Sequence, residues 1–174
     1  MTIFELQQRY ASHPNTGALN TILKDSGINH IFCSGLNASA APLFFSSQVR
    51  EADSPFVFIL RDLEEAGYFY HDLCQILSAD NVLFFPSSFR RAVRYGQKDA
   101  ANEILRTEVL SRVQHPEKGL CIVTYPDALA EKVVSKEELD QNTLTINVGE
   151  QIDTNFVMDV LRSVGFQYVD YVNG

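Results

Sequence analysis

The sequence is short of positive charge. It has 14 lysines and arginines against 22 aspartates and glutamates, which gives a formal net charge of -8. Non-specific attachment to nucleic acid or to an anionic lipid surface depends on summed positive charge, so both are disfavoured for the chain as a whole. Any contact with DNA is therefore expected to be local.

The sequence also lacks long apolar runs. None approaches the roughly 20 residues that a helix needs to cross a bilayer. The opening residues, "MTIFELQQRY", lack the basic and then apolar pattern of a secretory signal. We therefore expect a soluble, cytoplasmic protein that makes no membrane contact.

Cysteines are few, and their number is odd. Cys33, Cys74 and Cys121 are widely spaced, and each lies among apolar residues. This pattern favours reduced thiols in the core over disulfide bridges, and a reducing compartment.

The pattern of residues 1–132 predicts an α/β domain with a mostly parallel sheet flanked by helices. Apolar spacing predicts helices at 4–12 and 16–25. Asp62 with Glu65, and Asp99, are capping signals for two later helices. The continuous apolarity of the predicted strands is typical of a parallel sheet covered on both faces. These strands lie at 30–34, 55–60, 81–85 and 119–125.

Residues 133–174 differ in character, and they predict a smaller α+β module. Ser135 and Asp153 are helix caps, and the runs 143–149 and 167–172 alternate as half-exposed strands do. The final Asn-Gly pair is a hairpin signal without a returning strand. We therefore expect a truncated module, and a chain that is a fragment of a longer protein.

The segment "SGLNASAAP" follows an apolar run and precedes a predicted helix, which is the context of a phosphate-binding loop. A working loop needs a glycine, a lysine and a hydroxyl in its last three places. The residues in those places are Ala40, Ala41 and Pro42. The charge that meets the terminal phosphates is therefore missing, and proline also removes a backbone N–H from the helix start.

Two interpretations of this loop stay open. Ser34, Asn37 and Ser39 could still accept an anion at the helix N-terminus, or Asn37 or Ser39 could simply cap a helix that binds no ligand. The capped helix is favoured because the lysine is missing. The alternative function is a stand-alone nucleotide-binding enzyme that uses an atypical phosphate loop at Gly35–Ser39.

The basic cluster "FRRAVRYGQK" at 89–98 interleaves aromatic residues with positive charges, as nucleic-acid contacts do. A solvated loop that screens an acidic surface is the favoured account. The residues of the possible nucleic-acid contact are Arg90, Arg91, Arg94 and Lys98.

We expect no metal site and no catalytic group. His30 and Cys33 have a spacing that places them on opposite faces of a strand, so they do not easily hold one ion. His71 and Asp72 are neighbours on a helix and point apart, and no motif places a serine or cysteine as a nucleophile.

The order of segments "GLNASAAPLFF", "PFVFILRDLEEAGYFYHDLCQIL", "VLFFPSSF", "EILRTEVLSRV", "GLCIVTYPDALAEKVV", "VGEQID" and "VLRSVGFQYVDYVNG" resembles the amino-terminal region of bacterial transcription-repair coupling factors, the Mfd family. In that family this region is itself similar to the damage-recognition protein UvrB. The resemblance covers nearly the whole chain from about residue 29 onward. It implies a degenerate, UvrB-like domain at 1–132, followed by the start of a UvrA-binding module at 133–174.

The resemblance also implies a function. Gly35 matches the first glycine of the Walker A loop, Ala40 the second, Ala41 the lysine and Pro42 the magnesium-binding hydroxyl, so the segment is expected to be a non-catalytic scaffold with no cofactor. The parent proteins are ATP-driven DNA translocases that remove stalled RNA polymerase and recruit excision repair. Their ATP, magnesium, DNA and polymerase sites are expected elsewhere. UvrA is the expected partner here, through Gln167, Tyr168, Asp170 and Tyr171, although several members of the family have an arginine where this chain has Gln167.

Overall fold

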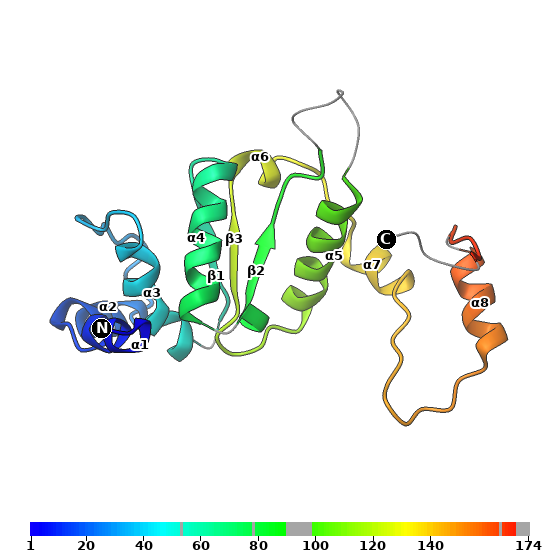
Figure 1. Cartoon of the computed structure of the whole chain (residues 1–174), viewed down its shortest axis with the longest axis horizontal. Coiled ribbons are helices and arrows are strands. Elements are labelled where there is room, and N and C mark those ends of the chain that lie inside the picture. The colour runs from blue at the N-terminus through cyan, green and yellow to red at the C-terminus, as the bar shows by residue number, and fades with distance from the viewer. Residues whose placement is uncertain (53, 78, 90–98, 164, 170–174) are drawn as a thin grey trace. The chain divides into compact units, whose positions relative to one another are not determined.

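The computed structural model describes residues 1–174 except 53, 78, 90–98, 164 and 170–174. The chain divides into two compact units, Met1–Lys132 and Val133–Gly174. Unit 1 contains the sheet, and the helices of unit 2 are drawn in yellow to orange in Figure 1. The fold class is confirmed, because unit 1 is an α/β structure with a small parallel sheet flanked by helices.

Three short parallel strands form the sheet in the described part of unit 1. Their order is β1-β3-β2, so β3 is central and pairs with both neighbours. Three of the four predicted strands are confirmed. They are β1 (Phe56–Ile59), β2 (Val82–Phe85) and β3 (Cys121–Thr124).

The prediction of a strand at 30–34 was wrong. This segment forms no strand, and the ring of Phe32 is 93% exposed. A strand is stabilised by pairing with a neighbour, and an apolar β-prone sequence does not supply that neighbour. The segment "HIFC" therefore does not place the following loop at the end of a sheet strand.

Two long helices cover opposite faces of the sheet. On α4 (Leu63–Ile76), the ring centre of Phe69 lies 4.9 Å from that of Phe58 on β1. The ring centre of Tyr70, also on α4, lies 5.2 Å from that of Phe84 on β2. On α5 (Ala100–Gln114), the guanidinium of Arg106 lies over the ring of Phe85. Consecutive strand residues point to opposite faces, so these contacts place α4 on one face and α5 on the other.

The covering of the sheet is incomplete at β1. Its residues alternate between half-buried and exposed, and Val57 and Ile59 are 53% and 58% exposed. The prediction that every strand is covered on both faces therefore holds for β3, which is buried throughout, but not for β1.

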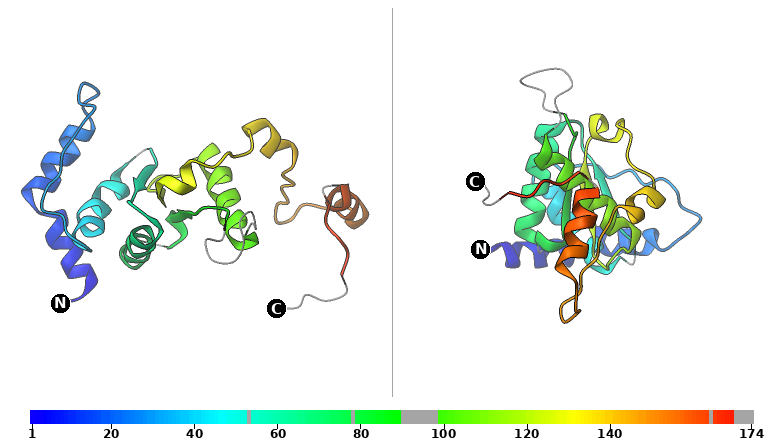
Figure 2. Two further views of the ribbon diagram at one scale, coloured as in Figure 1. Left: turned by 90° about the horizontal axis from the view of Figure 1, so that it is seen from above. Right: turned by 90° about the vertical axis from the view of Figure 1, so that its right-hand side faces the viewer.

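The first three helices pack together, and α3 contacts α4. They are drawn in blue and cyan in Figures 1 and 2. Phe45 of α3 joins them to the core, because its ring lies 5.8 Å from that of Phe58 on β1. The two predicted N-terminal helices are confirmed. They are α1 (Ile3–Ala11) and α2 (Pro14–Leu23), and the third helix of the group is α3 (Ala40–Glu51).

Predicted caps are confirmed for several helices. Asp62 accepts the N–H of Glu65 at 2.9 Å, and Asp99 accepts the N–H of Ala101 at 3.0 Å. The Glu65 carboxylate accepts the N–H of Arg61 at 3.1 Å, one residue before the cap of α4. The described part of unit 1 also contains two short elements, the 3₁₀ helix η1 (Ala79–Asn81) and α6 (Pro126–Leu129).

Unit 2 carries two helices in its described part, α7 (Lys136–Gln141) and α8 (Thr154–Ser163). Their predicted caps are confirmed, since Ser135 accepts the N–H of Glu138 and Asp153 accepts the N–H of Asn155. The predicted strand at 143–149 is absent, and 166–169 forms no strand either. None of the described residues 133–163 and 165–169 is buried, so they form no core of their own.

The three cysteines differ more than the sequence predicted. All are free thiols, but Cys33 is exposed, Cys74 is half-buried and only Cys121 is buried. Burial raises the pKa of Cys121 to about 12, so this thiol stays protonated at neutral pH. The prediction of a core thiol is therefore right for Cys121 and wrong for Cys33, whose surrounding segment is not a buried strand.

Candidate functional site

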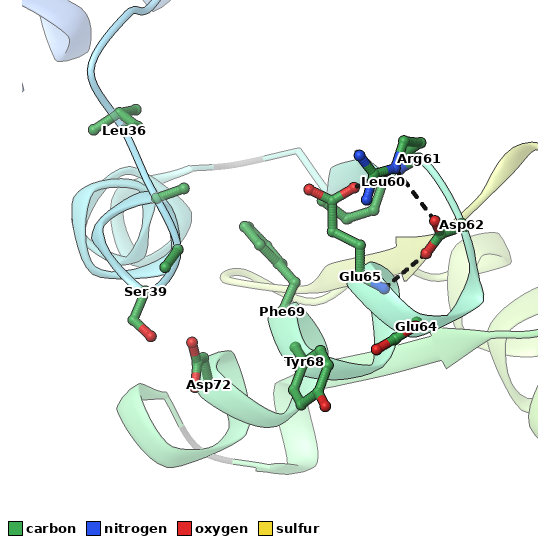
Figure 3. Close-up of a pocket in the computed structure, with 12 residues that line it drawn as sticks. Leu36, Ser39, Leu60, Arg61, Asp62, Glu64, Glu65, Tyr68, Phe69 and Asp72 are labelled. Atoms are coloured by element: carbon green, nitrogen blue, oxygen red, sulfur yellow. Dashed lines mark hydrogen bonds and ion pairs between the residues drawn. The ribbon is translucent and has the colours of Figure 1, made fainter.

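The loop at Gly35–Pro42 leads into α3 and lies beside a groove of about 720 Å³. One wall is the uncharged stretch Leu36–Ala41, and the other is the first part of α4 with the residues before it. Figure 3 shows the labelled side chains of both walls. The lining residues are Leu36, Ala38, Ser39, Ala41, Leu60, Arg61, Asp62, Glu64, Glu65, Tyr68, Phe69 and Asp72.

The loop backbone is already hydrogen-bonded within itself. The N–H of Ala40 donates to the carbonyl of Asn37 at 3.1 Å, and the N–H of Ala41 donates to the carbonyl of Ala38 at 3.3 Å. Pro42 has no N–H and is buried. A phosphate at a helix N-terminus is held by amide groups that have no partner in the helix. At the start of α3, the amides of Ala40 and Ala41 already donate to carbonyls of the loop, and Pro42 has no amide N–H to offer.

Ser39 precedes α3, but it does not cap the helix as the sequence predicted. Its backbone is already helical, and its side chain makes no capping hydrogen bond. A cap residue normally has extended backbone, from which its oxygen can reach the N–H two or three residues later. Asn37 is exposed, and its carbonyl rather than its side chain accepts from the helix start.

Two residues of the loop have left-handed backbone. Gly35 has φ of 81°, which costs glycine little, and Ala38 has φ of 46°, which is unfavourable for a residue with a Cβ. Gly35 and Ala40 face a different cavity of about 360 Å³ beside α1 and α2, whereas Ser39 and Ala41 line the groove. The structure therefore does not bring the predicted loop residues together around one site.

The groove is acidic. Four carboxylates line it, against the single guanidinium of Arg61. Arg61 pairs with Asp62 at 3.3 Å, and Ser39 and Asp72 face one another across the groove in Figure 3. A phosphate beside Ser39 would therefore meet a carboxylate, which is the opposite of the charge that it needs.

The carboxylates of the groove differ in their surroundings: Asp62 caps α4, whereas Glu64 and Asp72 lie beside Tyr68. The backbone N–H of Glu65 holds the pKa of Asp62 below its ordinary value, so this cap stays ionised. Glu64 and Asp72 flank Tyr68 at spacings of four residues, on one side of α4. The capping signal at Asp62 does not predict this surface; its signal in the sequence is the presence of four acidic residues in the eleven positions 62–72.

The second predicted site lies in unit 2. Gln167 is exposed and Tyr168 is 74% exposed. Both line a cavity of about 250 Å³ with residues of α8, including Met158 and Leu161. These two residues are therefore on the surface, but 166–169 is not the strand that was expected. Asp170 and Tyr171 lie outside the described residues.

The residues of the basic cluster, Arg90, Arg91, Arg94 and Lys98, lie outside the described residues. In the part of the chain that the structure describes, no three His, Cys, Asp or Glu side chains are grouped so that they could hold a metal ion. No helix among the described residues is long and apolar enough to span a membrane.

Comparison with known proteins gives one match. The chain is 22% identical over 159 residues to a Staphylococcus aureus (strain bovine RF122 / ET3-1) protein named transcription-repair-coupling factor. The chain is thus similar to a coupling factor. The match covers 86% of this chain but only 14% of that protein, so the chain spans about a seventh of the length of its relative. No family model matches the chain, and no solved structure matches it.

Proposed function

We propose that this chain is the UvrB-like segment of a transcription-repair coupling factor, and that it helps to recruit UvrA to stalled RNA polymerase during nucleotide excision repair. The observation that carries the proposal is the similarity to the coupling factor, which extends over 86% of the chain. The ATP-driven translocation of DNA, and the contacts with polymerase, belong in this proposal to other parts of the parent protein.

We also propose that the segment performs no nucleotide chemistry. Two features support this: the paired amides at Ala40 and Ala41, and the carboxylates across the groove from Ser39. ATP titration by calorimetry tests it. We expect no saturable binding, either by the natural chain or by Ala41→Lys, since Pro42 still lacks a magnesium-binding hydroxyl. Saturable binding that disappears when Gly35 is replaced by a bulky residue would favour the nucleotide-binding enzyme.

The proposed UvrA contact includes Gln167 and Tyr168. The minority of interface residues whose truncation to alanine costs more than about 1 kcal/mol of binding free energy is enriched in tyrosine. We therefore expect Tyr168→Ala to weaken UvrA binding at least about fivefold in a pull-down or titration. Tyr68→Ala is a matched control, because Tyr68 is similarly exposed, at 70%, but lies on α4 of unit 1.

The same measurement can contradict the proposal. If Tyr68→Ala weakens UvrA binding and Tyr168→Ala does not, the interface is on unit 1. If UvrA does not bind the natural chain at all, recruitment of UvrA is not a property of this segment.

A further inference from the structure

A largely buried charged network lies just after the carboxyl end of β2. The carboxylate of Glu131 accepts hydrogen bonds from the hydroxyls of Ser87 and Ser88, the second at 2.7 Å, and from the N–H of Ser88 at 2.9 Å. Its ion-pair partner is Arg106, at 3.5 Å. Residues more than 40 positions apart along the chain are thereby joined.

Arg106 forms the centre of this network. It is only 6% exposed, and its Nη1 donates to the carbonyls of Pro86 at 2.8 Å and Ala128 at 3.1 Å. Its Cζ atom lies 4.2 Å from the centre of the Phe85 ring, a cation–π geometry. The guanidinium therefore connects the end of β2 to α6 from its position on α5.

Glu131 is held in the charged form. Burial disfavours its carboxylate, but the hydrogen bonds from Ser87 and Ser88 and the charge of Arg106 outweigh burial, so the pKa of Glu131 lies below its ordinary value. A buried charged group of this kind is often no more stabilising than apolar residues of the same size, and its better-attested use is to specify one arrangement.

The network lies next to two features of the chain, which are the hydrogen bond between Ser88 and Asp99 and the end of unit 1. The carbonyl of Ser88 accepts the N–H of Asp99 at 2.8 Å, so these two residues lie side by side. Glu131 is followed by Lys132, the last residue of unit 1. The Glu131 carboxylate thus contacts Ser88, whose carbonyl is bonded to Asp99, and Glu131 is itself the residue before the last one of unit 1.

We propose that Glu131 is a latch that couples the paired residues Ser88 and Asp99 to the exit of the chain from unit 1 at Lys132. Breaking the hydrogen bond between Ser88 and Asp99 frees the chain at Lys132 to move. Movement of the chain at Lys132 likewise favours breaking that hydrogen bond, because a coupling free energy acts equally in both directions. The latch therefore gives unit 1 a means of signalling to the segment that begins unit 2.

Glu131→Gln tests the latch, because it keeps the size of the side chain but removes its charge and half of its acceptor capacity. Two local openings are measured: hydrogen exchange of the Asp99 amide, and tryptic cleavage after Lys132. We expect both to become about tenfold faster, the factor that corresponds to roughly 1.4 kcal/mol. Ser88→Ala removes a single hydroxyl donor and is the milder variant if Glu131→Gln folds poorly.

Two controls separate coupling from general loosening. Glu150→Gln removes a carboxylate that accepts the N–H of Asn147 at 3.0 Å in unit 2, and should leave both rates unchanged. Val49→Ala removes a fully buried side chain on α3, and lowers global stability without touching the network.

Three results would overturn the latch. If Lys132 cleavage accelerates while exchange at Asp99 does not, Glu131 acts only locally. If Val49→Ala accelerates both as much as Glu131→Gln does at an equal loss of stability, the openings are global. If neither rate changes in Glu131→Gln, the carboxylate does not hold the two places together.

Discussion

Arg106→Ala is expected to carry a large penalty for the loss of a single polar side chain. It removes the donor of two buried carbonyls, the ion-pair partner of Glu131 and the cation over Phe85. Removing one member of a buried charged pair costs about 3–5 kcal/mol. Glu131 keeps its serine donors and is 15% exposed, so we expect the lower part of that range, about 3–4 kcal/mol.

Urea unfolding measures this cost. The chain has no tryptophan, so far-UV circular dichroism is the appropriate signal. The double variant Arg106→Met with Glu131→Leu is the informative comparison, because it removes both charges and fills the space with apolar atoms. We expect it to be more stable than Arg106→Ala alone. A loss below about 1 kcal/mol for Arg106→Ala would refute the reasoning, since it would mean that the buried contacts contribute no more than a surface pair.

Three further predictions concern stability. Because the pKa of Glu131 is lowered from 4.5, its stabilisation is complete above that pH and is lost as pH falls through the lower folded-state pKa; Glu131→Gln should reduce this acid sensitivity in pH-dependent unfolding. Ala38→Gly should raise the melting temperature or leave it unchanged, because relief of the left-handed backbone, about 1 kcal/mol, offsets the added freedom of the unfolded chain. Leu73→Ala should cost about 2–5 kcal/mol in urea unfolding, whereas Ile104→Ala, at an exposed position on α5, should cost less than about 0.5 kcal/mol.

The sequence predicted best those features that depend on residues close to one another. Asp62, Asp99, Ser135 and Asp153 each sit where a helix begins, and a cap needs only its own side chain and an N–H two or three positions later. Ser39 is the exception, because its backbone has already entered the helix. Even a local signal therefore depends on where the backbone turns.

Features that join distant segments could not be predicted in this way. On α5, the apolar Ile104 is exposed, whereas the charged Arg106 is buried beside Val109. An arginine in a helix is ordinarily assigned to solvent. Its burial is intelligible only once Glu131 and the carbonyls of Pro86 and Ala128 are known to meet it, and no pattern along the chain predicts that meeting.

The candidate groove shows the same division. The sequence identified the missing lysine and hydroxyl of the loop, because Ala41 and Pro42 are visible as residue types. It could not show that the amides of Ala40 and Ala41 donate to the loop's own carbonyls, or that Asp72 and Ser39 line the same groove and face one another in Figure 3. These two facts depend on the path of the backbone between α2 and α3 and on the packing of α3 against α4.

The segment at 30–34 shows why an apolar run predicts a strand less reliably than a capping residue predicts the start of a helix. A capping side chain accepts a hydrogen bond from an N–H within the first turn of its own helix. The N–H and C=O groups of a strand, in contrast, stay unpaired unless a second strand lies beside it. In the described sheet, β1 lies at an edge, and Val57 and Ile59 remain exposed on the face opposite α4. The apolar pattern correctly reports which segments can join a sheet. Whether such a segment forms a strand depends on whether a neighbouring strand is present to pair with it. The tertiary fold determines this, and the segment's own sequence does not.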